Sequence, residues 1–165
     1  MALSPIEREF LIQQYEIGPS VLGAALAAVP DDAVFFRPAP NAWSVHEIIL
    51  HCADSETMAA SRIRLVATQD RATIVAYDEA DWAIRLDYHA LPMPPALDAI
   101  AAVRANTAIL IRSLPDAAWN RVGHHTASGP YSAEDWLHSY AVHLHDHADQ
   151  IAANVASWKA AHASG

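Results

Sequence analysis

The sequence predicts an all-α fold, a bundle of four helices separated by long connections. Apolar residues recur at helical spacing in four long segments, and three of these open with a serine that precedes an acidic residue by three positions. No sustained alternation of polar and apolar residues marks a strand, so we expect no sheet. A chain of 165 residues can build one core but not two ordinary domains, so residues 1–165 are expected to form one domain.

The first helix is expected to begin at Ser4. This serine can cap the helix, the next residue is a proline suited to the first helical position, and Glu7 completes a capping box. Helical spacing continues to about residue 30. Gly18 and Pro19 lie in the middle of this segment, and a proline inside a helix removes a backbone donor. We therefore expect a kink or a break at this pair.

The second and third helices are separated by a long connection. Ser44 and Glu47 open the second helix, which keeps its period to about Thr68. Residues 72–95 then form a connection with room for a short helix, and a connection of this length in a small domain is usually functional or a structured cover. The third helix is expected over residues 95–114.

The last helix is expected to begin at Ser132, where Asp135 takes the place of the glutamate in the capping box, and to continue to about Ala161. A second long connection precedes it. Two long connections imply that the four helices are not arranged simply up-down-up-down.

Composition and charge exclude several classes of function. Ten Lys and Arg against nineteen Asp and Glu give a net charge of −9, which repels a phosphate backbone, so nucleic acid is excluded as a partner. The N-terminus carries charges where a signal peptide needs an apolar run, and no stretch of eighteen apolar residues could span a membrane. We therefore expect a cytoplasmic protein with a small-molecule substrate. The single cysteine, Cys52, suits a reducing compartment and lies on an apolar stripe, as a small core residue would.

Ten histidines are the main candidates for chemistry, and six of them lie in the second and fourth helices. At ~100° per residue, His143 and His147 stack along one edge of the last helix's apolar stripe, and His51 lies at the edge of the second helix's stripe. His138 and His145 fall on the opposite edge. The first three rings can therefore converge on one divalent ion, with water in an open position.

Three neutral nitrogen donors suit Zn²⁺ or Ni²⁺ and do not distinguish them. Because ligating imidazoles must be neutral, metal binding is expected to weaken below about pH 6.5. A histidine-rich helix also produces this spacing by chance, so solvated histidines remain the alternative from spacing alone.

Several neighbours of the three histidines have two interpretations. Asp54, Ser55 and Glu56 follow the second-helix histidine within about a turn and could orient a ligand or act as a base. A solvated or salt-bridged helix face is the favoured interpretation of these three. Trp136 and Tyr140 lie beside the last-helix histidines and can wall a cleft.

Two helix motifs and three loop motifs are similar to those of the DinB/YfiT superfamily, in order over most of the chain. They are W-S-V-H-E-I-I-L-H-C-A-D-S-E at 43–56, Y-A-V-H-L-H-D-H-A-D-Q-I at 140–151, R-P-A-P at 37–40, Y-D-E at 77–79 with Trp82, and G-H-H at 123–125. The resemblance implies a four-helix fold, a homodimer, and metal ligands at His51, His143 and His147, the same three residues that the angular argument selects.

The resemblance also implies an enzyme, either a metal-dependent hydrolase or an S-transferase that uses a low-molecular-weight thiol. In both cases the metal would activate a water or a thiol as the nucleophile. A non-catalytic metal-binding or stress-response module is the alternative. Val142 and Asp146 stand where the YfiT pattern often has tryptophan and histidine, and the loop after His125 lacks an expected proline-acid pair. These departures leave the substrate open.

Overall fold

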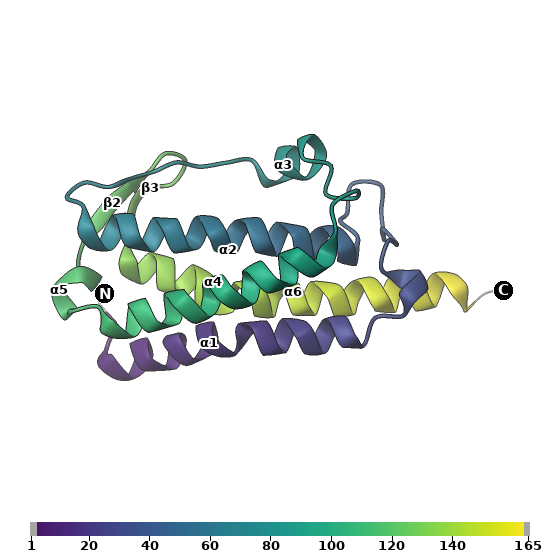
Figure 1. The fold of residues 1–165 in the computed structure, drawn as a ribbon, viewed down its shortest axis with the longest axis horizontal. Coiled ribbons are helices and arrows are strands. Elements are labelled where there is room, and N and C mark those ends of the chain that lie inside the picture. Colours follow the sequence, from purple (N-terminus) through teal and green to yellow (C-terminus); the bar gives the residue numbers. More distant parts are fainter. Residues whose placement is uncertain (1–2, 164–165) are drawn as a thin grey trace.

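The computed structural model describes residues 3–163, and four long helices run side by side through this part of the chain (Figure 1). They are α1 (Pro5–Ala27), α2 (Val45–Thr68), α4 (Met93–Ser113) and α6 (Ala133–His162). Helices α1 and α2 each pack against both α4 and α6. In Figure 1, α1 and α6 run in one direction and α2 and α4 in the other. The predicted four-helix bundle, and its departure from an up-down-up-down order, are confirmed.

The three predicted capping boxes are present. The hydroxyls of Ser4, Ser44 and Ser132 each accept a hydrogen bond from the backbone N–H three residues on, and the carboxylate of that residue accepts one from the serine N–H. These reciprocal bonds satisfy donors that a helix N-terminus otherwise leaves unpaired. Helix α4 begins at Met93, two residues before its predicted start.

The break expected at Gly18 and Pro19 does not occur, because α1 runs unbroken through both residues. Pro19 has no N–H to donate to the carbonyl of Tyr15, one turn earlier. Nη1 of Arg104, on α4, donates to that carbonyl instead, at 2.7 Å. A Cβ on Gly18 would lie 3.2 Å from Nη1 of Arg104 and from Cβ of Leu144. The glycine therefore lets neighbouring helices approach closely enough for this substitute hydrogen bond.

The prediction of no sheet is wrong for one small region. Strands β1 (Thr73–Ile74), β2 (Val122–His125) and β3 (Gly129–Ser132) form a sheet in that order, with β1 parallel to β2 and β2 antiparallel to β3. The buried position of β2 is Gly123, which gives no apolar side chain to the sequence pattern. A Cβ there would lie 2.7 Å from the Ala72 carbonyl oxygen, which accepts a hydrogen bond from His124. Close packing of the β2 backbone against Ala72 therefore takes the place of a buried apolar side chain in this strand.

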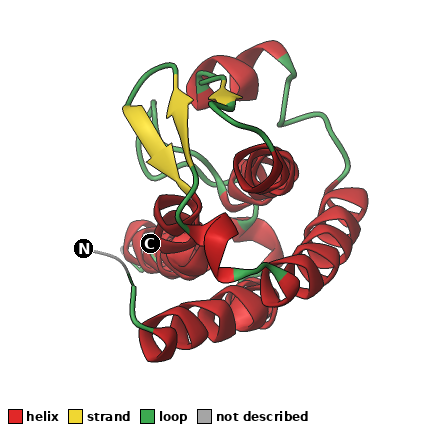
Figure 2. Ribbon diagram, turned by 90° about the vertical axis from the view of Figure 1, so that its left-hand side faces the viewer, coloured by secondary structure: helices red, strands yellow, loops and turns green. Residues whose placement is uncertain are grey.

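Both connections contain short elements that lie outside the bundle. The chain between α2 and α4 carries β1 and the expected short helix, α3 (Glu79–Arg85). The chain between α4 and α6 carries α5 (Asp116–Trp119), β2 and β3, and the short helix η1 (Asp31–Ala33) follows α1. The strands and α3 lie together on one side of the bundle (Figure 2), next to α2 (Figure 1). None of the described helices is both long and apolar enough to cross a membrane.

Candidate metal centre

His51, His143 and His147 lie together between α2 and α6. Each offers one ring nitrogen, and these three atoms are all within 4.8 Å of one another. The ring centroid of His51 is 5.6 Å from that of His143 and 4.9 Å from that of His147, and the last two are 4.6 Å apart. His143 and His147 are one turn apart on α6, which stacks their rings on one face of the helix. Nitrogen donors at such separations can share one ion.

The two histidines of α6 are held in a defined orientation. Nδ1 of His143 lies 2.8 Å from Oε1 of Glu56, and Nδ1 of His147 lies 2.8 Å from Oε1 of Gln150. Because each Nδ1–H donates to its oxygen partner, each Nε2 is left with a lone pair to offer. Hydrogen bonds of this kind fix the tautomer and the ring orientation of metal-binding histidines.

His51 is buried and makes no hydrogen bond to any residue that the structure describes. Its exposed fraction is 1 %, and its Nδ1 has no partner. Its Nε2 is 3.8 Å from Oε2 of Glu79, the first residue of α3, which is too long for a hydrogen bond. An unpaired buried polar group costs on the order of 1–3 kcal/mol. A metal ion bound to the ring would compensate this cost, so the residues present fit such an ion.

The protonation states of this cluster also suit a metal. Burial, together with the charges of His147 and His143, lowers the pKa of His51 to about 3. Burial and the charge of His143 lower the pKa of His147 to about 4, although hydrogen bonding to Gln150 acts in the opposite direction. Both imidazoles are therefore neutral at neutral pH, which is the state that binds metal.

A buried ion pair supports the His143 side of the cluster. Both oxygens of Glu56 accept hydrogen bonds from Arg104 at 2.7 Å, and neither side chain is more than 1 % exposed. Burial acts to raise the pKa of Glu56, but the hydrogen bonds and charges of His143 and Arg104 outweigh it and hold the pKa below its usual range. Nη2 of Arg104 also donates to the Tyr140 carbonyl. The solvated or salt-bridged face favoured from sequence is half right for Glu56, which is salt-bridged but lies inside the bundle, where it also orients His143.

Aromatic rings surround the three histidines. The Trp43 ring centroid lies 4.6 Å from that of His51, and the Tyr140 ring lies 5.5 Å from that of His143. Tyr140 therefore walls the cluster as predicted. Trp136 is fully buried and donates from Nε1 to the Ala59 carbonyl, so it belongs to the core behind Tyr140.

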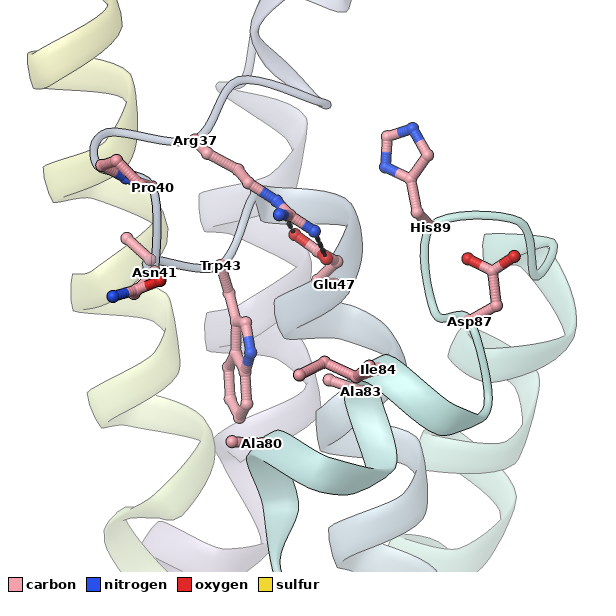
Figure 3. Close-up of a pocket in the computed structure, with 11 residues that line it drawn as sticks. Arg37, Pro40, Asn41, Trp43, Glu47, Ala80, Ala83, Ile84, Asp87 and His89 are labelled. Atoms are coloured by element: carbon pink, nitrogen blue, oxygen red, sulfur yellow. Dashed lines mark hydrogen bonds and ion pairs between the residues drawn. The ribbon is translucent and has the colours of Figure 1, made fainter.

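A pocket of about 410 Å³ lies beside the cluster and shares Trp43 with it. Figure 3 shows Trp43 pointing down toward Ala80 of α3, with Ile84 beside it, while Arg37 and Glu47 face each other above. Glu47 is buried, which acts to raise its pKa, but its ion pair with Arg37 and its hydrogen bonds with Ser44 outweigh burial and lower the pKa. The remaining lining residues are Pro40, Asn41, Ala42, Ala83, Asp87 and His89. The pocket thus has an apolar floor and a polar rim.

The other helix histidines lie away from the cluster. Nε2 of His145 bonds the Gln14 carbonyl of α1, and Nε2 of His46 bonds the Leu91 carbonyl, while His138 is exposed. This separation agrees with the angular prediction. Sequence reasoning did not identify Arg104 or Glu79 as neighbours of the cluster, because each reaches it from a separate element. The Y-D-E motif contains Glu79 but gave it no role.

Comparisons with known proteins agree with this geometry. The sequence profile described as the DinB superfamily matches residues 14–151, a segment that contains all three histidines. Among curated proteins, "Putative metal-dependent hydrolase OB0782" of Oceanobacillus iheyensis is 34 % identical over 109 residues, which cover 66 % of this chain and 63 % of that protein. A "Putative metal-dependent hydrolase" of Geobacillus thermodenitrificans is 28 % identical over 104 residues, which cover 63 % of this chain and 58 % of that protein.

The chain thus spans less than two thirds of the length of these two relatives. Among solved structures, YfiT from Bacillus subtilis superimposes with a TM-score of 0.85 at 24 % identity, covering 93 % of this chain and 88 % of that one. That structure is described as having an unusual four-helix bundle topology. The likeness confirms the fold.

Proposed function

The chain belongs to the DinB superfamily, and on that premise we propose that it is a metal-dependent enzyme with one divalent ion on His51, His143 and His147. The observation that carries this proposal is His51, a buried imidazole without a hydrogen-bond partner among the described residues, facing two oriented histidines. A purely structural histidine cluster would be expected to pair its buried nitrogens.

We favour hydrolysis as the reaction. The relatives reported above carry names that refer to metal-dependent hydrolases, and three histidine ligands leave an open position. When bound, such an ion lowers the pKa of a coordinated water or thiol and supplies a nucleophile at neutral pH. The neutral imidazoles keep the full charge of the ion available for this effect. Transfer to a low-molecular-weight thiol would use the same site, and Zn²⁺ and Ni²⁺ suit its donors equally.

The surroundings support a small molecule as the substrate. The pocket next to Trp43 offers an apolar floor with a polar rim, as small-molecule sites commonly do. Glu79, the first residue of α3, places a carboxylate close to the histidine cluster. Trp43 and Tyr140 shield the rings from bulk water, which strengthens electrostatic interactions at the centre.

Metal analysis of the untagged protein and its alanine variants tests the proposal. We expect one divalent ion per chain, and His51→Ala, His143→Ala or His147→Ala should each lower metal affinity by at least about tenfold. The matched control is His138→Ala, on the same helix but exposed, which should keep the metal. Hydrolysis of small ester and amide substrates should stop when the ion is chelated. A full complement of tightly bound metal in His143→Ala would show that the site is wrong, and a metal-loaded protein inactive on every small substrate would favour a binding module.

A further inference from the structure

Arg62 of α2 is a half-buried cation that forms no ion pair with any residue between 3 and 163. Its Nη1 donates to the Tyr140 hydroxyl at 3.1 Å and its Nη2 to the Val75 carbonyl at 3.1 Å. Its Nε is buried and has no partner. A guanidinium carries five N–H donors, so these two hydrogen bonds leave most of its capacity unused. In a chain of net charge −9, a half-buried cation without a carboxylate requires an explanation.

Arg62 lies next to the metal centre. The ring of Tyr140 touches both, since its hydroxyl accepts from Arg62 and its ring centroid is 5.5 Å from that of His143. On its other side, Cζ of Arg62 lies 5.4 Å from the ring centroid of Tyr77. Tyr77 belongs to the connection that leads from β1 to α3. One tyrosine ring therefore separates the guanidinium from a candidate metal ligand.

Unpaired buried polar atoms gather at this place. Five side-chain atoms in the described part of the chain are buried without a hydrogen-bond partner, and they include Nδ1 of His51, Nε of Arg62 and the hydroxyl of Tyr77. The first belongs to a candidate metal ligand. The other two are both donors, and they belong to side chains in contact with each other. An unsatisfied N–H of a guanidinium and an unsatisfied hydroxyl beside it suit an anionic acceptor.

The positive charge of Arg62 is felt by its neighbours. Burial lowers the pKa of His125 on β2, and the charge of Arg62 lowers it further. The net negative charge of the whole chain does not attract anions over long distances, so a local cation is needed to hold one. The planar guanidinium matches a carboxylate with two parallel hydrogen bonds.

We propose that Arg62, together with the hydroxyls of Tyr77 and Tyr140, binds a carboxylate group of the substrate beside the metal centre. The substrate class is then a small organic acid whose reacting bond faces the three histidines while its carboxylate is held by α2 and the β1–α3 connection. This inference deepens the proposed function and rests on it. The binding of the anion itself, however, needs no metal.

Benzoate and its uncharged isostere benzamide are suitable probes. Amide chemical shifts of the metal-free protein, recorded at about pH 8 so that histidines are neutral, report binding at the site directly. We expect saturable binding of benzoate, at least about tenfold weaker binding of benzamide, and about tenfold weaker benzoate binding by Arg62→Met. Arg62→Lys keeps the charge but loses the planar guanidinium, so its affinity for benzoate should lie between those of the parent protein and of Arg62→Met.

Arg64→Met is the matched control. It removes the same charge from the same helix, but Arg64 bonds Asn106 and Thr107 on the α4 side. It should change benzoate affinity less than about twofold, since only general electrostatics are altered. Circular dichroism checks that each variant is folded, and Arg62→Lys serves if Arg62→Met is not.

Three results would overturn the inference. The first is the absence of saturable benzoate binding at ~50 mM, well above a millimolar dissociation constant. The second is that Arg64→Met weakens benzoate binding as much as Arg62→Met does. The third is benzoate binding that appears only when metal is added. The last result would mean that benzoate binds the ion itself. Because the key measurement uses metal-free protein, failure of the metal site would be seen separately in the metal analysis.

Discussion

The clustering of the three candidate ligands could be predicted from sequence because the spacing of residues along a helix determines the direction in which their side chains point. His143 and His147 are four residues apart, so their convergence needs only helical geometry. His51 lies on another helix, and its contribution followed from its place at the edge of an apolar stripe. Arg104 and Glu56 could not be paired in this way, because α2 and α4 bring them together only after the bundle has formed. Long-range ion pairs leave no local pattern.

The hydrogen bonds behind the histidines make a prediction about metal affinity. Gln150→Ala removes the acceptor of Nδ1 of His147, and Glu56→Gln weakens the acceptor of Nδ1 of His143. Each should raise the metal dissociation constant about 10- to 100-fold, because the ligand loses its fixed orientation and part of its basicity. Competition with a chromophoric chelator measures this. Asp149→Asn, exposed on the same helix, is the control and should bind as the parent does.

Glu56→Gln also leaves Arg104 buried without its counter-ion, which should cost about 3–5 kcal/mol of stability. Gln150→Ala carries no such cost, so it separates the effect on affinity from the effect on folding. Unchanged affinity in Gln150→Ala would mean that the orientation of His147 is set by packing alone.

At the scale of elements, the helix caps could be predicted from sequence, but the hydrogen bond that keeps α1 continuous at Pro19 could not. A capping box is local, and all three were predicted at the correct serines. The continuity of α1 through Pro19 depends on Arg104, 85 positions later in the chain, which supplies the missing donor to Tyr15. The small sheet depends on Gly123 fitting against Ala72. Both features are tertiary contacts, so local spacing gave no sign of them.

The caps give a graded prediction for stability. Ser132→Ala should cost about 1 kcal/mol, because one backbone N–H at the start of α6 loses its acceptor. Ser44→Ala should cost more, since Ser44 is fully buried and its partner Glu47 is also bound to Arg37. Urea unfolding followed by circular dichroism measures both. Ser139→Ala, on the exposed surface of α6, should be nearly neutral, and a larger cost for Ser132 than for Ser44 would contradict the ranking.

At the scale of the whole molecule, the connection between α2 and α4 decides the topology. It carries the chain back along the bundle, so that α4 runs parallel to α2 instead of antiparallel (Figure 1). The same connection places Tyr77 and Glu79 over the histidine side of the bundle. The number of long connections was predictable from sequence, but their paths were not. The homodimer stays a prediction, and exposed Ile6 and Phe10 of α1 form an apolar surface that it could use.

The histidine cluster also makes the stability of the metal-free protein depend on pH. His51 and His147 have pKa values of about 3 and about 4 when folded, against about 6.5 in an unfolded chain. Below about pH 6.5 the unfolded chain therefore binds protons that the folded protein does not, and the free energy of unfolding falls as pH falls. Above that pH the contribution is constant. The same lowered values mean that protons would compete with metal at these two candidate ligands only at a lower pH than the 6.5 expected from sequence.

Urea unfolding of metal-free protein between about pH 7 and about pH 5 covers this range while most carboxylates stay ionised, and a variant without the two imidazoles separates their share from that of the other histidines. We expect stability to decrease steadily toward pH 5 and the decrease to be smaller in the double variant His51→Phe, His147→Leu, which has no imidazole to protonate at these positions. Saturating metal should raise stability at every pH, since the ion binds only the folded protein, and the gain should shrink with acid as protons displace it. A flat profile in the metal-free protein would mean that the two imidazoles are hydrated in solution, and the buried cluster that the metal requires would not exist.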